Sequence, residues 1–159
     1  MSANITAAVA VPSAVMPTLK IQVGALCRDP ASGKVLLITS RGTGRWIIPK
    51  GWPMTDRSDA DAAMQEAWEE AGVKGNISRD EIGRYDYDKL NDSTGGIIPV
   101  QVRVFTVEVS ELADSYPEAG QRTRRWVSPG KAARMVDEKG LKKILRNLPK
   151  IEARSGKRK

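Results

Sequence analysis

The sequence contains no histidine and only one cysteine, Cys27, among its 159 residues. The absence of histidine excludes Ser–His and Cys–His nucleophilic catalysis and every histidine-ligated metal. A lone thiol excludes an internal disulfide framework and a multi-cysteine zinc site. Acid–base chemistry must therefore rest on Asp, Glu, Lys or Tyr, and any metal site must be lined mainly by oxygen.

Long uninterrupted apolar runs are also missing. The first 18 residues contain no Asp, Glu, Lys or Arg, but Pro12 and Pro17 interrupt them. This segment lacks the basic start of a secretion signal, and it is too short and broken to cross a membrane. We therefore predict a flexible N-terminal arm over residues 1–17, no membrane partner and a cytoplasmic location.

Basic residues outnumber acidic ones, which gives a formal net charge of +7. Residues 150–159 hold five basic residues and one acid, so the excess charge is concentrated at the C-terminus. We predict a basic, disordered tail there. Nucleic-acid contact is the alternative for the tail, but no aromatic-plus-basic RNA motif accompanies it, and nucleic acid is not the partner we expect.

The middle of the chain, residues 18–149, is predicted to form one domain that contains both strands and helices. Apolar and alternating runs predict strands at residues 19–28, 35–40, 46–49, 81–90, 97–110 and 122–127. Ser58 or Asp59 is placed to cap a helix that runs to Ala71 and ends at Gly72. Residues 128–136 and 138–148 read as closing helices. Because strands and helices follow no regular βαβ alternation, we expect an α/β fold with a mixed sheet and helices packed on it.

Three acids stand close together near the end of the predicted central helix. At the helical repeat, Glu66, Glu69 and Glu70 fall within an arc of about 100°. Glu66 and Glu70 repel each other at a spacing of four, and acids near a helix C-terminus oppose the helix dipole. No basic residue answers them along the helix. A solvated acidic face is the simple interpretation, but a hard divalent ion such as Mg²⁺ explains the cluster better.

The residues before this helix suggest a polyanion. Gly51 stands where the backbone turns sharply or approaches another group closely, and Lys50 beside it is able to reach a phosphate. Arg41 and Arg45 lie a few residues earlier. Carboxylates for a metal and cations for a polyanion together indicate phosphoryl chemistry. Farther along the chain, Arg103 and Lys89 are additional candidates for phosphate contacts. Trp46 and Trp52 could stack on a base or fill the core, and we expect them in the core.

The stretch from Lys50 to Val73 resembles the signature of the Nudix hydrolases. Gly51 starts the signature and the run from Gln65 to Val73 ends it. Two positions depart from the family pattern: Arg57 stands where the first glutamate belongs, and Gln65 stands where the arginine belongs. We expect Gln65 to hold a glutamate or a loop carbonyl, and Arg57 to face solvent or substrate.

The resemblance implies an α/β/α sandwich and hydrolysis of a diphosphate linked to another group X. It makes Glu66, Glu69 and Glu70 the metal-binding and catalytic residues, with Glu66 as general base and Mg²⁺, or Mn²⁺ in its place, as cofactor. Stretches such as "RWIIPKGW" and "EEAGVKG" look most similar to the branch acting on diphosphoinositol polyphosphates and diadenosine polyphosphates. The implied partner is a small-molecule polyphosphate, bound by Arg41, Arg45, Lys50 and Gly51.

Two other functions are compatible with the same residues. The replacements at Arg57 and Gln65 favour a catalytically weakened Nudix-fold module that binds a nucleotide or a partner. The high isoelectric point and the basic tail suggest an RNA-end processing enzyme.

Overall fold

The computed structural model describes residues 19–149. The predicted arm at residues 1–17 and the predicted basic tail at residues 150–159 lie outside the described residues. Among the helices that the structure describes, none has the length and apolar character needed to cross a membrane.

Eight strands form one sheet. They are β1 (Lys20–Arg28), β2 (Val35–Thr39), β3 (Trp46–Ile47), β4 (Lys50–Gly51), β5 (Val73–Ile77), β6 (Gly83–Leu90), β7 (Ile97–Leu112) and β8 (Arg124–Val127). The central path runs β3-β2-β1-β7-β5, while β4 pairs with β1, β6 with β7 and β8 with β2. Strands β1 and β7 run parallel, and the other pairings within the described part of the chain are antiparallel. The predicted mixed sheet is confirmed.

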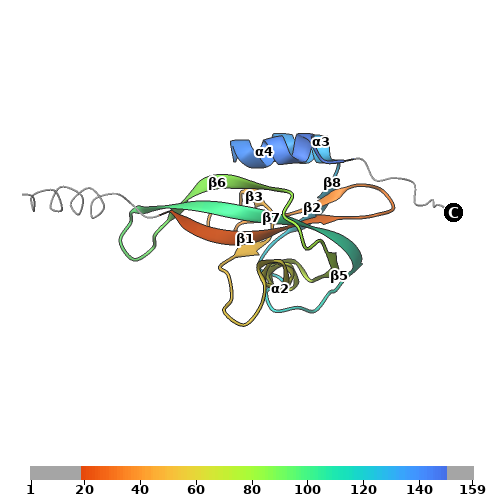
Figure 1. Cartoon of the computed structure of the whole chain (residues 1–159), viewed down its shortest axis with the longest axis horizontal. Coiled ribbons are helices and arrows are strands. Elements are labelled where there is room, and N and C mark those ends of the chain that lie inside the picture. Colours follow the sequence, from red (N-terminus) through yellow and green to blue (C-terminus); the bar gives the residue numbers. More distant parts are fainter. Residues whose placement is uncertain (1–18, 150–159) are drawn as a thin grey trace, which may run out of the picture.

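Helices cover both faces of the sheet. Helix α2 (Asp59–Ala71) lies on one face, and α3 (Pro129–Met135) and α4 (Lys139–Arg146) lie together on the other (Figure 1). The arrangement is an α/β/α sandwich, as predicted.

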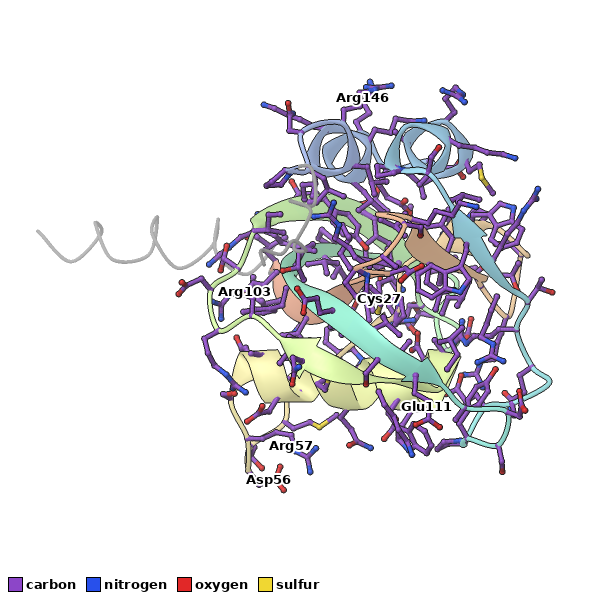
Figure 2. All side chains as sticks on the ribbon, turned by 90° about the vertical axis from the view of Figure 1, so that its right-hand side faces the viewer. Cys27, Asp56, Arg57, Arg103, Glu111 and Arg146 are labelled. Carbon is purple, nitrogen blue, oxygen red and sulfur yellow. The ribbon has the colours of Figure 1, made fainter. Side chains whose placement is uncertain are left out.

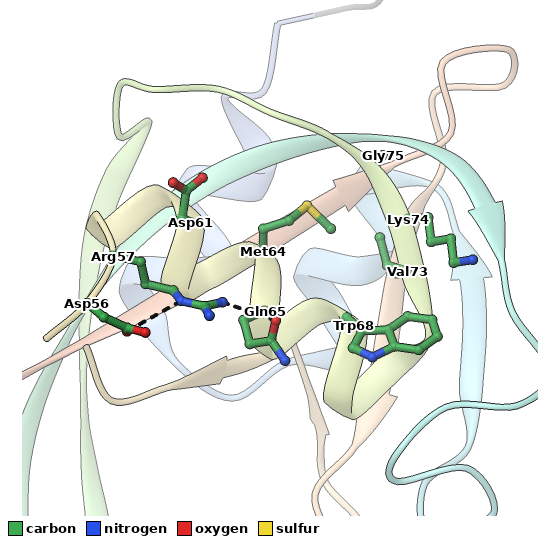
Figure 3. A pocket seen from close by; sticks show the side chains of 9 residues that line it. All are labelled: Asp56, Arg57, Asp61, Met64, Gln65, Trp68, Val73, Lys74 and Gly75. Atoms are coloured by element: carbon green, nitrogen blue, oxygen red, sulfur yellow. Dashed lines mark hydrogen bonds and ion pairs between the residues drawn. The ribbon is translucent and has the colours of Figure 1, made fainter. Parts of the chain in front are cut away.

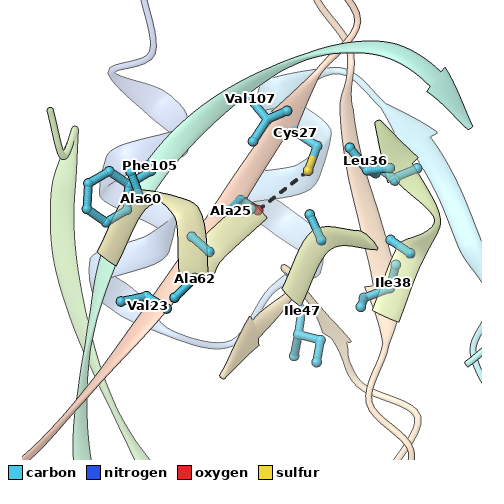
Figure 4. Packing of buried hydrophobic residues seen from close by; sticks show 14 residues of the cluster. Val23, Ala25, Cys27, Leu36, Ile38, Ile47, Ala60, Ala62, Phe105 and Val107 are labelled. Carbon is cyan, nitrogen blue, oxygen red and sulfur yellow. Dashed lines mark hydrogen bonds between the residues drawn. The ribbon is translucent and has the colours of Figure 1, made fainter. Parts of the chain in front are cut away.

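The alternation of strand side chains divides the core into two layers. Val23, Ala25 and Cys27 of β1 face the alanines of α2, whereas Leu26 faces α3 and α4 (Figure 4). Small residues on both sides let α2 approach the sheet closely. Burial raises the pKa of the Cys27 thiol to about 12, and its Sγ donates to the Ala25 carbonyl at 3.8 Å, so this side chain acts as core packing. Cys27 lies inside the molecule, while Asp56 and Arg57 lie at the periphery (Figure 2).

Local signals set the ends of α2. The Ser58 Oγ accepts a hydrogen bond from the Asp61 N–H at 3.1 Å, and Gly72 ends the helix in the left-handed region with φ 68°. The predicted helix bounds are confirmed. Strands β4 and β5 were not predicted, because a two-residue strand shows no periodicity and β5 is largely polar. Trp52, expected in the core, is 43% exposed.

We predict that Gly72→Ala destabilises the protein more than Gly33→Ala. Both glycines have positive φ, but only at Gly72 would an added Cβ meet other atoms, namely Tyr116 ring carbons at 2.6 and 2.9 Å and the Ala113 oxygen at 3.0 Å. Backbone strain alone costs about 1–2 kcal/mol at Gly33, and the overlap adds about 1–3 kcal/mol at Gly72. Urea unfolding of both variants measures the difference, and equal losses would contradict the prediction.

Candidate active site

The close approach expected at Gly51 is made by the Glu66 carboxyl group. Strand β4 lies between β1 and α2, and it pairs Gly51 with Val23 of β1. A Cβ added to Gly51 would overlap all three atoms of the Glu66 carboxyl group. Only glycine therefore leaves room for this carboxyl group, which rests directly on the backbone of the strand.

Glu70 points into the same region and is buried, with 8% of its surface exposed. Its Oε1 accepts the backbone N–H of Lys50 at 3.3 Å, and its Oε2 lies 3.6 Å from the Arg122 guanidinium. Arg122 is itself buried, and it donates to Glu118 at 2.9 Å and to the Thr39 carbonyl at 3.1 Å.

The helix itself supplies no basic partner for the acids, as expected, but Glu70 has one in Arg122. Arg122 precedes β8 and lies far from α2 in the sequence, so a survey of the helix alone could not find it. The only hint was the basic run that begins at Arg122, which predicted a strand and gave no indication that this one side chain turns inward.

The carboxyl groups of Glu66 and Glu70 disfavour each other's negative charge. Burial, followed by the charges of Glu70 and Glu69, raises the pKa of Glu66 from 4.5 to about 8. Burial also raises the pKa of Glu70, although Arg122 and Lys50 oppose this. A cation placed at the pair would relieve the repulsion.

Glu69 is held by a short chain of hydrogen bonds on the outer side of α2. Arg57 Nη1 donates to Gln65 Oε1 at 3.1 Å, and Gln65 Nε2 donates to Glu69 Oε2 at 2.8 Å. Arg57 also forms an ion pair with Asp56 at 3.6 Å, beside a surface pocket (Figure 3). The structure agrees that Gln65 holds a glutamate. Arg57 is exposed to solvent, as expected, but it is not free, because its guanidinium donates to Gln65 and so joins the loop to the helix.

The donor set fits a divalent cation that also takes oxygens from a substrate. Within residues 19–149, no group of three acidic or cysteine side chains is disposed to hold a metal ion alone. Glu66 and Glu70 supply two neighbouring carboxyl groups, and Mg²⁺ is commonly held by one or two carboxylates together with waters and substrate phosphates. Glu69, engaged by Gln65, stays a predicted ligand.

A cavity of about 750 Å³ is lined by Lys50 and Arg122, the two residues that contact Glu70, although neither Glu66 nor Glu70 lines it. Among the residues that line it are five cationic and five acidic side chains: Arg41, Arg45, Lys50, Lys89 and Arg122, and Asp86, Asp88, Asp92, Asp137 and Glu138. The backbone N–H of Lys50 donates to Glu70, and the Arg122 guanidinium forms an ion pair with it. These two residues therefore connect the cavity to the carboxyl pair.

The side chains predicted to bind phosphate already contact other residues. Arg41 donates to Gln121 at 2.9 Å, and Arg45 donates to Glu138 at 3.0 Å. Lys50 lies over the ring of Tyr87, with Nζ 4.8 Å from its centre. Arg103 is not among the residues lining this cavity.

The side chain of Arg103 instead forms ion pairs with Asp59 and Glu81. Tyr87 and Glu138 line the cavity but were missed by the sequence reasoning, which had no motif to mark them.

Fold and site together define an α/β/α domain in which helix α2 presents a pair of carboxyl groups near a cavity lined by both cationic and acidic side chains. Residues 18–148 match the family model of the NUDIX domain, and the chain belongs to the Nudix family. The resemblance seen in the sequence is confirmed. Members of this family generally use divalent metal ions.

Curated relatives and solved structures agree with this membership. The chain is 29% identical over 130 residues to Nudix hydrolase 13, mitochondrial, of Arabidopsis thaliana, covering 77% of this chain and 63% of the relative. It is 31% identical to diphosphoinositol polyphosphate phosphohydrolase 3-alpha of Mus musculus, covering 67% and 63%. The chain thus spans less than two thirds of the length of these relatives. An Ap4A hydrolase from C. elegans shares the fold with a TM-score of 0.56 at 17% identity, covering 81% of this chain and 95% of that one.

We predict that Glu66→Gln stabilises the metal-free protein at pH 8. The folded-state pKa of Glu66 is raised to about 8, so between about pH 4.5 and 8 the folded state binds more protons than the unfolded state. Stability is therefore lost as pH rises through this window, and glutamine removes that loss. Thermal unfolding in chelator should give the variant a higher Tm at pH 8, with the gain shrinking toward pH 5. A gain that is independent of pH would contradict this origin.

The hydrogen-bond chain gives a second expectation. Gln65→Leu breaks both bonds, Arg57→Ala breaks one, and each bond contributes about 0.5–1.5 kcal/mol. The double variant should be no less stable than Gln65→Leu alone, because Arg57 acts through Gln65. Urea unfolding of the two single variants and the double variant completes the cycle. Additive losses would show that Arg57 stabilises the loop in another way.

Proposed function

We propose that the domain hydrolyses a diphosphate linkage in a nucleoside- or inositol-polyphosphate type of substrate, with Mg²⁺ as the metal and Mn²⁺ as a substitute. The observation that carries the proposal is the Glu66–Glu70 pair: Glu66 rests on Gly51, and Glu70 contacts Lys50 and Arg122, which line a neighbouring cavity. Family membership supports the same chemistry.

Each residue has a physical role in this proposal. Glu66 and Glu70 would hold Mg²⁺, with Glu69 as a further ligand, and the ion would offset charge on the attacked phosphate and lower the pKa of bound water. Glu66 would accept the proton of the attacking water. Lys50 holds phosphate oxygens at the cavity wall, while Arg122 keeps Glu70 in place.

A binding module with weakened catalysis remains the second candidate. The replacements at Arg57 and Gln65 favour it, because they alter the fastening next to Glu69. The hydrogen bonds from Arg57 to Gln65 and from Gln65 to Glu69 support the enzyme instead. Through them the loop stays joined to the helix and to Glu69, although the residues differ from the family pattern. The cytoplasmic location stays a prediction, and the names of several plant relatives include "mitochondrial".

Hydrolysis should depend on a divalent metal and on Glu70. Phosphate release from a panel of polyphosphates should require Mg²⁺ or Mn²⁺ and stop with a chelator. Glu70→Gln should lower metal affinity or activity by roughly tenfold or more, because it removes one of the paired carboxylates. Glu111→Gln, an exposed acid on β7, is the matched control and should leave activity unchanged. Full activity in chelator, or in a Glu66→Gln, Glu70→Gln double variant, would overturn the metal site.

A further inference from the structure

Helix α4 presents a row of exposed cations on the side that faces away from the sheet. At about 100° per residue, Lys139, Lys143 and Arg146 fall within an arc of about 60°. Leu141 and Leu145 fall on the opposite side of the helix and are buried. Arg146 lies at the outer surface of the layer that α3 and α4 form (Figure 2).

Helix α3, which lies beside α4, adds two further cations (Figure 1). Lys131 and Arg134 are exposed, whereas Ala132 and Ala133 between them are buried. We call the five exposed cations of the two helices the basic face: Lys131, Arg134, Lys139, Lys143 and Arg146. Within residues 19–149, none of the five forms an ion pair with an acid.

The acids of this segment do not offset the basic face. Residues 129–149 contain two acids, Asp137 and Glu138, and both contact Arg45 and line the 750 Å³ cavity. None of the five cations is among the residues that line that cavity. Substrate phosphates bound in the cavity would therefore not meet them, and the proposed function leaves the basic face unexplained.

The stability of the two helices accounts for only part of this charge. Arg134, Lys143 and Arg146 lie in last turns, where a cation is favourable against the helix dipole. Lys131 and Lys139 instead lie in first turns, where an acid is preferred and neither helix has one. Lys139 and Lys143 also repel each other at a spacing of four. A negatively charged partner would account for cations that weaken their own helices.

The surroundings of the basic face favour nucleic acid over a membrane as that partner. A helix that binds a membrane surface inserts apolar side chains beside its cations. None of the large hydrophobic side chains exposed in the described residues belongs to α3 or α4. Residues 129–149 also contain no Trp, Tyr or Phe on which an unpaired base could stack. The contact that remains is one between cations and the regularly spaced phosphates of a duplex.

We propose that the basic face binds the phosphate backbone of a nucleic-acid duplex, without regard to its base sequence. Its cations neutralise phosphates and release their counterions, so the affinity falls steeply as salt rises. The basic face and α2 lie on opposite faces of the sheet, so the duplex and a polyphosphate substrate use different parts of the molecule (Figure 1). The inference does not depend on the proposed function, because it concerns binding and no step of hydrolysis.

The test measures duplex binding by the full chain and two matched double variants. Fluorescence anisotropy of a labelled DNA duplex of about 20 base pairs gives Kd at several salt concentrations, in chelator. The first variant is Lys131→Gln with Lys139→Gln, which removes the two cations that helix stability does not explain. The control is Lys20→Gln with Lys74→Gln, which removes the same charge from exposed positions on β1 and β5.

The Lys131→Gln, Lys139→Gln variant should bind roughly tenfold or more weakly at about 0.1 M salt. The slope of log Kd against log salt should become shallower by about 2, or about 1 for each lost phosphate contact. The control should behave as the parent, and duplexes of unrelated sequence should bind alike. Equal binding by all three proteins would overturn the proposal, because residues 150–159 would then carry the binding. Equal losses in both variants would overturn it too, since net charge alone would explain them.

Competing polyanions and an activity assay separate the remaining outcomes. Vesicles containing phosphatidylserine and a polyglutamate peptide are offered to the same proteins. A parent that binds either of these but not the duplex would overturn the choice of nucleic acid. Polyphosphate hydrolysis should be the same in the parent and in Lys131→Gln, Lys139→Gln. Lost hydrolysis with unchanged duplex binding would place these cations in the active site, which would contradict the inference. A parent that hydrolyses nothing but binds the duplex as described counts against the proposed function alone and supports the basic face.

Discussion

The packing of the Glu66 carboxyl group against Gly51, with a second buried carboxyl group close by, is the interaction on which the site depends. Glu66 rests on Gly51, and Glu70 is buried beside it. Two neighbouring acids withdrawn from water repel each other, so the fold must surround them with compensating groups. Arg122 and the backbone of Lys50 provide part of this compensation. The raised pKa values show that it is incomplete, which leaves the pair ready for a cation.

The packing of the core brings this pair against strand β4, next to the central strand β1. Ala60, Ala63 and Ala67 let α2 lie close to β1, and β4 lies beside both. A larger side chain on this face of the helix would lift it from the sheet and separate Glu66 from Gly51. The small residues of the core therefore set the distance between Glu66 and Gly51 on which the site depends.

Features set by neighbouring residues could be predicted from the sequence, and features set by distant segments could not. Ser58 and Gly72 fix the ends of α2 through local hydrogen bonds and backbone geometry, so the helix was placed correctly. Strand β4 exists only because β1 pairs with it, and two residues carry no pattern. Arg122 and Glu138 reach the cavity from segments far along the chain. Their contacts follow from tertiary packing, for which spacing gives no signal.

The amide at Gln65 has a consequence for how this loop and helix could change over time. A carboxamide carries both a donor and an acceptor, and a half-turn of its end group exchanges them. In this chain it accepts from a cation at Arg57 and donates to Glu69. An acid at that loop position would require the amide to turn over, and the amide oxygen would then face the Glu69 carboxylate, which has no proton to donate. With Gln65 in this place, the charge of the loop residue is therefore tied to Glu69: a donor at residue 57 keeps the glutamate bound, and a change to an acid would release it.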